Sequence, residues 1–317
     1  MSESRDKGPA DVALRERLQV ALAERYVIVD EIGHGASAIV VAARDARHFN
    51  RDVAIKVIRP EVAESVGVSR FRREMQLVAQ LNHPHILPLL DWGEAAGLLY
   101  YVMPLVQGES LRARIMREQQ LPLDQAVHIT RDVASALQHA HTHGVVHRDV
   151  KPENIMLVEG EASLTDFGLA RALERREGES VTASGIAVGT AAYMSPEQAS
   201  GGAGDARSDQ YSLACVLYEM LAGDPPFHAS TVQAMLARHR ADTPAHLTSV
   251  RPSLPAGVDD AVLRALSKVP ADRFLDVAHL AQALEAALTS ATLAAVRALT
   301  PPPTLTKRRR PTNRLLA

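Results

Sequence analysis

The sequence predicts an α+β protein, in which a small antiparallel β-rich part with one main helix precedes a larger, mainly helical part. The β-rich runs YVIVDEIG, AIVVAARD and DVAIKVIR follow one another from Tyr26, and glycine or polar turns separate them. Beyond Gly108 the apolar residues recur at helical spacing instead. The chain has 317 residues, of which 46% are hydrophobic, and this is enough to build a core in each of two domains or lobes.

Composition and charge argue against several classes of protein. The net charge of -2 gives no global excess of lysine and arginine, so we expect no nucleic-acid partner and no anionic membrane surface. The single cysteine, Cys215, permits no internal disulfide and fits a reducing compartment. The charged N-terminus lacks the apolar core of a signal peptide, and no run approaches the roughly 20 apolar residues of a membrane span. We therefore expect a cytoplasmic chain with no membrane span.

The β-rich part is expected to follow a short helix and to form one sheet. Leu14, Leu18 and Leu22 recur at helical spacing, so an amphipathic helix lies in a leader, residues 1–25. The three β-rich runs predict an antiparallel meander. SRFRREMQLVAQLN then predicts a helix with Ser69 as its N-cap, and HILPLLDWGE and GLLYYVMPLV predict two further strands.

The second part is expected to pack around a buried central helix. SDQYSLACVLYEMLAG is apolar almost all round, as a buried helix would be. ESLRARIMREQQ, LDQAVHITRDVASALQHAHTHG, TVQAMLARHR, GVDDAVLRALSKV and DVAHLAQALEAALTS predict the other helices, and NIMLV and ASLTDFG predict two short strands. Residues 178–189 have the composition of a mobile loop, and TPPPTLTKRRRPTNRLLA that of a disordered linker. The longest of these helices has an apolar face made of Ala126, Ile129, Val133, Ala136, Leu137 and Ala140.

The first motif that carries chemistry is IGHGASAIV, which places Gly33 and Gly35 at a turn between two strands. A glycine-rich hairpin is usually only a hairpin. This one lacks both the following helix of a Rossmann loop and the Gly-Lys-Ser/Thr ending of a Walker loop. A glycine-rich flap is what remains, and its backbone can approach phosphates because two residues lack Cβ.

The second motif is VAIK, in which Lys56 follows three apolar residues of the next strand. Taken alone, a lysine at a strand end is more often solvated than functional. Glu74, in the following helix, is the partner that would let Lys56 reach inward and hold phosphate oxygens without leaving an unpaired buried charge. The sequence therefore predicts that the two residues form a pair.

The third motif is HRDVKPEN, from His147 to Asn154, followed by DFG at Asp166. On its own HRDVKPEN would be read as a solvated surface loop. However, Mg²⁺ takes hard oxygen ligands and tends to use one or two carboxylates together with substrate phosphates. Asp166 and Asn154 would supply such oxygens as metal ligands, which leaves Asp149 for an incoming hydroxyl. Lys151 would neutralise charge that develops on the transferring phosphate.

With these motifs the sequence resembles the Hanks-type protein kinases, most closely the bacterial eukaryotic-like serine/threonine kinases, from about Tyr26 to about Leu288. Its motifs stand in the family's order and include VAIK, HRDVKPEN, DFG, GTAAYMSPEQ and PADRF. The resemblance implies a bilobal protein-kinase fold over residues 26–288, with lobes of about 26–106 and 107–288, before a Pro-rich basic tail, 289–317. It also implies an enzyme that uses ATP and Mg²⁺ to phosphorylate Ser or Thr hydroxyls of protein substrates.

The resemblance assigns the nucleotide site as well. The hinge would run from Met103 to Gly108, with Met103 as gatekeeper, while the carbonyl of Pro104 and the amide of Val106 pair with adenine. Proline is acceptable at 104 because only its carbonyl is needed. The residues expected around ATP are Ile32, Gly33, His34, Gly35, Ala36, Ser37, Ala38, Ile39, Val40, Ala54, Lys56, Met103, Pro104, Val106 and Met156.

Within HRDVKPEN the resemblance makes His147 a structural anchor, and Arg148 would receive a phosphorylated activation loop. Asp149 would orient the substrate hydroxyl and accept its proton. Thr190, in GTAAY, would bridge Asp149 and Lys151, and together with DVKPEN this favours the serine/threonine class. The catalytic set implied is Lys56, Glu74, Asp149 and Lys151, with Asn154 and Asp166 as metal ligands.

Further carry-overs are structural. Glu197 would pair with Arg273, and Asp209 would hold the catalytic loop. A regulatory spine would stack Val78, Leu89, His147 and Phe167. The chain departs from the family pattern at Ala38, which replaces the third glycine of the flap, and this leaves activity nearly unaffected.

Four histidines, His139, His141, His143 and His147, invite a metal-site interpretation. Helical geometry puts His139 and His143 on one face but His141 on another, and no nearby carboxylate or thiolate completes a ligand set. We therefore do not expect a metal site there. The basic run KRRR, from Lys307 to Arg310, stands close to TPPP and is interpreted as part of a solvated linker.

Regulation and a rival function complete the expectations. Thr182 and Ser184 lie where kinases of this type autophosphorylate, so phosphate there would pair with Arg148 and raise activity. A dimer could phosphorylate itself in trans. The rival is a pseudokinase that binds ATP as a scaffold. A pseudokinase commonly lacks at least one catalytic or metal-binding residue, whereas this chain has Lys56, Glu74, Asp149, Asn154 and Asp166. A small-molecule kinase is disfavoured because GTAAYMSPEQ resembles a platform for protein substrates.

Overall fold

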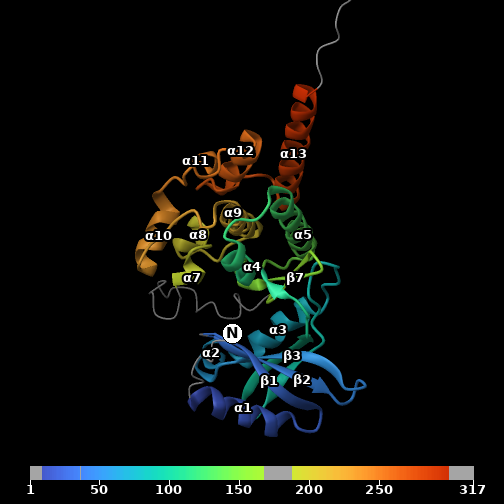
Figure 1. The fold of residues 1–317 in the computed structure, drawn as a ribbon. Coiled ribbons are helices and arrows are strands. Elements are labelled where there is room, and N and C mark those ends of the chain that lie inside the picture. The colour runs from blue at the N-terminus through green and yellow to red at the C-terminus, as the bar shows by residue number, and fades with distance from the viewer. Residues whose placement is uncertain (1–8, 36, 168–187, 300–317) are drawn as a thin grey trace, which may run out of the picture.

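The computed structural model describes residues 9–35, 37–167 and 188–299, which form two lobes. Figure 1 shows the smaller lobe, built on a β-sheet, below the larger helical lobe. The expected bilobal protein-kinase fold is confirmed.

The small lobe contains a five-stranded antiparallel sheet in the order β1-β2-β3-β5-β4. The predicted meander is therefore confirmed, with two irregularities in β1 between Ile28 and Asp30 and between Glu31 and Gly33. Its strands are β1 (Tyr26–His34), β2 (Ala38–Asp45), β3 (Arg51–Ile58), β4 (Asp91–Ala95) and β5 (Leu98–Pro104).

The two faces of this sheet are covered by different helices. Side chains alternate across a strand, so Leu99 and Tyr101 of β5 join one core with helix α3 (Val68–Val78). Leu98, Tyr100 and Val102 join a second core with Leu14, Leu18 and Leu22 of helix α1 (Pro9–Leu22). The predicted amphipathic N-terminal helix is confirmed, and it covers the outer face of the sheet.

The start of α3 differs from the prediction. The helix begins at Val68 and not with Ser69 as its cap, and it ends at Val78 rather than near Asn82. A preceding helix, α2 (Pro60–Val66), stops at Gly67, whose φ of 75° is one that glycine adopts without steric cost. Gly67 then serves as the N-cap of α3 with no side-chain cap. Sequence reasoning missed α2 because its charged and apolar residues form only two turns.

The predicted strand HILPLLDWGE is correct only in its last part, since β4 begins at Asp91. Upstream, Ile86 makes a single parallel bridge to Leu164, and the Leu87 amide donates to the Leu164 carbonyl at 2.9 Å. Pro84 and Pro88 interrupt a regular ladder because proline has no N–H to donate. This segment, His83 to Leu87, therefore ties α3 to the larger lobe.

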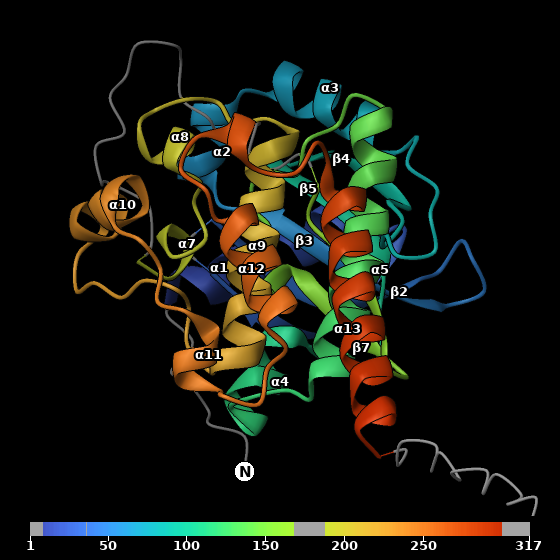
Figure 2. The same cartoon turned by 90° about the horizontal axis from the view of Figure 1, so that it is seen from above.

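The large lobe packs around helix α9 (Ala206–Ala222), whose residues from Ser208 to Leu221 are all buried. Figure 2 shows α9 surrounded by other helices, as predicted for an apolar central helix. The predicted apolar face of α5 (Leu123–Thr142) is also buried at all six positions. Around them lie α4 (Leu111–Glu118), α7 (Val188–Ala191), α8 (Pro196–Ala199), α10 (Val232–Ala241), α11 (Leu247–Val250), α12 (Ala256–Ala265) and α13 (Val277–Leu299), with short 3₁₀ turns at Pro152–Asn154 and Pro270–Asp272.

A small sheet of three strands, in the order β6-β7-β8, lies between the lobes and carries the catalytic loop. It consists of β6 (Glu109–Ser110), β7 (Ile155–Val158) and β8 (Glu161–Leu164). The predicted loop at 178–189 lies outside the described residues except for Val188 and Gly189, which belong to α7. The tail expected over 289–317 begins too early, because α13 continues to Leu299, and the rest of that tail is outside the described residues. Among those that are described, no helix is long and apolar enough to cross a membrane.

Candidate active site

Lys56 and Asp166 form an ion pair that joins the two lobes. Lys56 lies in β3, and Asp166 follows β8 with a φ of 66°, an uncommon conformation for a residue with a side chain. The Lys56 Nζ lies 2.5 Å from the Asp166 Oδ2, and only 16% and 14% of the two side chains are exposed. A charge pair thus spans the cleft where the phosphates of a nucleotide were expected.

Tyr101 of β5 is a third member of this group, which sequence reasoning missed. Its hydroxyl donates a hydrogen bond to the Asp166 Oδ1, so both carboxylate oxygens are engaged. Burial and then Asp166 raise the pKa of Tyr101, which keeps the hydroxyl protonated as a donor. Burial tends to raise the pKa of Asp166, but Lys56 and the two hydrogen bonds hold it below its usual value. The signal in the sequence was the two-residue spacing of Tyr101 and Met103, which puts both on one face of the strand.

Glu74, the expected partner of Lys56, lies on the buried face of α3 and is 6% exposed. It therefore lies in the core that α3 shares with β5, on the cleft side of the sheet. The contact that the structure gives Lys56 is with Asp166. The Lys56–Glu74 pair stays a prediction.

Asp209, at the start of α9, accepts hydrogen bonds from the backbone of the HRDVKPEN loop. Its Oδ2 accepts the His147 amide at 2.8 Å and its Oδ1 accepts the Arg148 amide at 2.7 Å. Arg148 has a φ of 66°, so these two bonds fix a backbone turn that the residue would seldom adopt unaided. The predicted role of Asp209 is confirmed. Its Oδ2 makes a third hydrogen bond, with His141 Nε2 at 2.8 Å.

Asp149 lies at the centre of the next cluster. Its Oδ2 accepts hydrogen bonds from the Lys151 Nζ at 2.7 Å and from the Asn154 Nδ2 at 3.1 Å. Asn154 also donates to the Asp149 carbonyl at 2.8 Å. Thr190 accepts from Lys151 at 3.4 Å, so the expected contact between these two is present. Its expected contact with Asp149 stays a prediction.

The predicted spine residues meet behind this cluster. His147 and Phe167 pack edge to face with ring centroids 4.6 Å apart, and His147 Nε2 donates to the Thr165 carbonyl at 2.7 Å. Val78, Leu89 and Phe167 line one small cavity together with Met103, the expected gatekeeper. His147 and Phe167 are therefore in contact, while the stacking of Val78 and Leu89 on them stays a prediction.

Of the expected nucleotide residues, Ile39 was wrong, because its side chain is fully buried in the core that the sheet shares with α1, on the face away from the cleft. Gly33 pairs with Val40 across β1 and β2, and the Gly35 amide donates to the Ala38 carbonyl at 2.9 Å, which closes the flap. Ala54 pairs with Met103 across β3 and β5, and Pro104 ends β5. Met156 lies opposite Ser110 at the floor, while Ala36 is outside the described residues.

The hinge ends at Gly108, and this position needs glycine. A Cβ there would lie 2.2 Å from the Leu157 carbonyl oxygen, closer than any side chain could tolerate. The backbone after the hinge therefore packs directly on β7. This contact sets the small lobe against the floor of the cleft.

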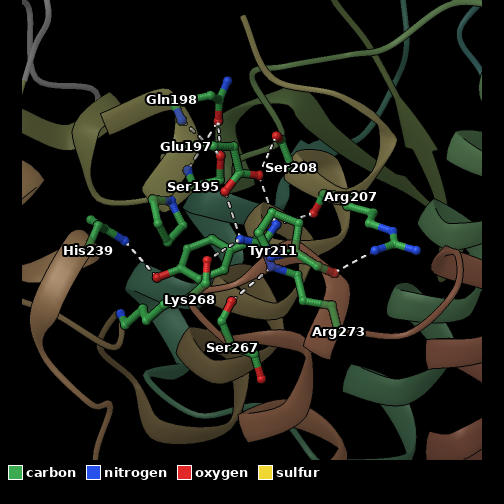
Figure 3. A network of polar contacts seen from close by, with 12 residues as sticks. Ser195, Glu197, Gln198, Arg207, Ser208, Tyr211, His239, Ser267, Lys268 and Arg273 are labelled. Atoms are coloured by element: carbon green, nitrogen blue, oxygen red, sulfur yellow. Dashed lines mark hydrogen bonds and ion pairs between the residues drawn. The ribbon is translucent and has the colours of Figure 1, made fainter. Parts of the chain in front are cut away.

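The Glu197–Arg273 pair, predicted from SPE and PADRF, is confirmed and forms a dense network (Figure 3). Arg273 donates from Nη1 and Nη2 to the two Glu197 oxygens at 2.8 and 2.7 Å, and its side chain is 0% exposed. Ser208 donates to the same carboxylate at 2.6 Å. Burial tends to raise the pKa of Glu197, but Arg273 and Ser208 lower it to about 2. The pair fixes α8 to the segment before α13.

The four histidines of the helix and catalytic loop do not share one site. His141 bonds Asp209 and His147 bonds Thr165, so each has a structural partner. His139 and His143 stack with ring centroids 4.4 Å apart. These residues thus have separate partners, one of which, Asp209, is a carboxylate. The expectation that they hold no common metal stays a prediction.

Comparison with known proteins agrees with this geometry. The family described as Protein kinase domain matches residues 26–279. Serine/threonine-protein kinase PknB of Mycobacterium leprae is 42% identical over 265 residues, covering 82% of this chain and 42% of the relative. Serine/threonine-protein kinase PknD of Mycobacterium tuberculosis is 39% identical over 268 residues, covering 84% of this chain and 40% of the relative. The crystal structure of the Mycobacterium tuberculosis PknI kinase domain has a TM-score of 0.66 at 32% identity, covering 83% of this chain and 96% of that chain.

The sheet-based small lobe and the helical large lobe thus define a protein-kinase fold. The chain belongs to the protein kinase family, and its relatives are bacterial kinases of the eukaryotic-like serine/threonine type. It spans 42% of the length of the PknB relative that it matches.

Proposed function

We propose that this chain is an active protein kinase that transfers the γ-phosphoryl group of ATP to Ser or Thr hydroxyls of proteins. The observation that carries the proposal is the convergence of Lys56 and Asp166 from two lobes beside the Asp149, Lys151 and Asn154 cluster. Protein kinases as a family use ATP and Mg²⁺, and this chain has each polar group that such a reaction needs.

Asp149 is the proposed base. It orients the substrate hydroxyl and accepts its proton while the oxygen bonds to the γ-phosphorus and the bond to the ADP oxygen breaks. Lys151, 2.7 Å from Asp149, neutralises charge on the transferring group. Lys56 would hold the α- and β-phosphates, and Glu74 would keep it aimed inward when Asp166 serves as a metal ligand.

Asp166 and Asn154 are the proposed Mg²⁺ ligands. Asn154 uses its Nδ2 to hold Asp149, which leaves its side-chain Oδ1 as the atom for a cation. Asp166 adds a carboxylate, and these hard oxygens fit Mg²⁺. When bound, the ion offsets the negative charge of the phosphates, while the protein residues fix their position.

ATP is proposed to lie between the flap and the hinge, with adenine near the Pro104 carbonyl and the Val106 amide. Gly33 and Gly35 let the flap approach the phosphates, and Ala54, Met103 and Met156 provide apolar walls. Specificity for Ser and Thr is supported by the Lys151–Thr190 contact and by relatives that are themselves named serine/threonine-protein kinases.

Regulation by autophosphorylation is part of the proposal. Thr182 and Ser184 lie outside the described residues, but Arg148 is set by Asp209 beside the catalytic loop, and its Nε also donates to the Gly204 carbonyl at 3.2 Å. A phosphate on either residue would pair with this guanidinium and order the segment around it. Replacing both by alanine is expected to lower activity severalfold, and a fully active double variant would contradict this part.

The test is incubation of purified protein with ATP and Mg²⁺, with and without a generic protein substrate, beside Asp149→Asn. Phosphate is then located by mass spectrometry. Phosphoserine or phosphothreonine that depends on Asp149 is the expected result. ATP binding without any transfer in the wild type would favour the scaffold alternative instead.

A further inference from the structure

A second group of metal-ligating side chains lies away from the cleft, where the His83–Leu87 segment meets the large lobe. His85 comes from that segment, Asp132 from α5 and Glu161 from the first position of β8. One ligand atom from each lies within 4.8 Å of the other two. Three elements distant in the sequence therefore converge at one point.

His85 is oriented as a metal-binding histidine would be. Its Nδ1 donates to the Ala162 carbonyl at 2.8 Å, and because a carbonyl can only accept, the proton is on Nδ1. The lone pair of Nε2 is then free for a cation, and this atom lies 3.8 Å from the Asp132 Oδ1. A second bond that fixes tautomer and ring direction is the usual arrangement around a ligating histidine.

Asp132 is a fixed and buried carboxylate, with 1% of its side chain exposed. Its Oδ2 accepts the Ala162 amide at 3.2 Å, and its Oδ1 accepts from Arg131 at 3.3 Å. A carboxylate has about four lone-pair positions, so these bonds leave room for a cation. Glu161 is 61% exposed and can move to complete the set.

His128 adds a fourth group at the rim. Its Nε2 lies 3.4 Å from both the Asp132 Oδ2 and the Glu161 Oε1. However, its Nδ1 accepts from Arg131 at 2.7 Å, so the neutral ring carries its proton on Nε2. His128 therefore directs an N–H toward the carboxylates and is not itself a ligand in this arrangement.

We propose that His85 Nε2, Asp132 and Glu161 bind one divalent transition-metal ion, of which Zn²⁺ fits best, with water as the fourth ligand. Zinc bonds of about 2.0 to 2.2 Å place tetrahedral ligand atoms roughly 3.3 to 3.6 Å apart, so the 3.8 Å spacing of His85 and Asp132 requires only a small closure. One imidazole and two carboxylates suit Zn²⁺ better than Mg²⁺, which prefers oxygen alone. The ion would clamp the segment after α3 to α5 and β8.

The test is a calorimetric titration of the full chain, free of any affinity tag, with Zn²⁺ in excess Mg²⁺ and without nucleotide. His85→Ala removes the nitrogen ligand, and Glu161→Gln changes an exposed side chain that the fold does not need. His279→Ala is the matched control. His279 pairs with Asp276 at 2.7 Å on the surface, but among the described residues this pair belongs to no group of three metal-ligating side chains.

We expect one Zn²⁺ per chain, with affinity at least about tenfold weaker in His85→Ala and Glu161→Gln and unchanged in His279→Ala. His128→Ala should weaken binding less than His85→Ala. Added Zn²⁺ should raise the unfolding temperature of the wild type but not of Glu161→Gln. Equal Zn²⁺ affinity in wild type and Glu161→Gln, or no binding by the wild type, would overturn the proposal.

Discussion

Two largely buried ion pairs of this protein differ in how many hydrogen bonds fix the cation in place. Arg273 meets Glu197 with two parallel bonds. Its other N–H groups donate to the carbonyls of Ser267, Arg207 and Lys268 at 2.9, 2.7 and 3.3 Å. Lys56 meets Asp166 across the cleft with one ammonium, which has three donors and a flexible stem. The first pair lies wholly within one lobe, whereas the second joins two.

The difference separates a structural pair from a functional one. Arg273 has a rigid guanidinium in a fixed fork, and any change leaves a buried charge without its partner. In the proposed reaction Lys56 would exchange Asp166 for phosphate oxygens or for Glu74 without leaving the cleft. We therefore expect changes at the first pair to alter stability and changes at the second to alter turnover.

The largest effect is expected for Lys56→Met, which keeps the length of the side chain and removes the charge. The rate of phosphoryl transfer should fall by about 1000-fold or more, because the phosphates lose a positioned cation. Initial rates with saturating ATP would measure this. Wild-type turnover in the variant would refute the role of Lys56.

Next comes Arg273→Ala, which should lower the free energy of unfolding by about 3 to 5 kcal/mol. The cause is the uncompensated Glu197 carboxylate, with 24% of its side chain exposed. Urea denaturation measures the change. Arg238→Ala is the control, since its pair with Asp242 is 4.0 Å long and half-exposed, and it should cost at most about 1 kcal/mol.

The same pair predicts an acid-dependent loss of stability. Arg273 and Ser208 lower the pKa of Glu197 from 4.5 to about 2, so this stabilisation is present above pH 4.5 and is lost as the pH falls toward 2. Urea midpoints measured across this range for wild type and Glu197→Gln test it. The difference between the two proteins should shrink on acidification, and a constant difference would argue against a charged Glu197.

The smallest effect is expected for Tyr101→Phe, which removes only the hydroxyl bonded to Asp166. A hydrogen bond to a charged group is worth about 1.5 kcal/mol, so kcat/KM should fall by roughly tenfold. Tyr100→Phe is the matched control, because Tyr100 lies in the core on the opposite face of β5. Equal rates in the two variants would show that Tyr101 does not position Asp166.

Much of the fold followed from local patterns in the sequence. The β-rich runs and the apolar α9 were predicted well, because the burial of an element on one side or on all sides appears in its pattern of apolar residues. The predictions for the start of α3 and for the HILPLL segment were wrong. The helix starts after the turn at Gly67, and Ile86 forms only a bridge to Leu164, and both features depend on neighbouring elements.

The candidate site divides in the same way. Asp149, Asn154 and Asp166 could be found because they stand in recognisable motifs. Tyr101, the bond from His141 to Asp209 and the His85 cluster could not, because each requires residues distant in sequence to meet in space. Motifs record chemistry that is local in the chain, and packing supplies the rest.

The most direct test of this account measures turnover and stability on the same preparations of Lys56→Met and Arg273→Ala. The account predicts that Lys56→Met loses phosphoryl transfer with a smaller drop in the urea midpoint than Arg273→Ala, because Asp166 keeps its hydrogen bond from Tyr101. Retained transfer in Lys56→Met, or an unshifted midpoint in Arg273→Ala, would contradict the division between a functional and a structural pair.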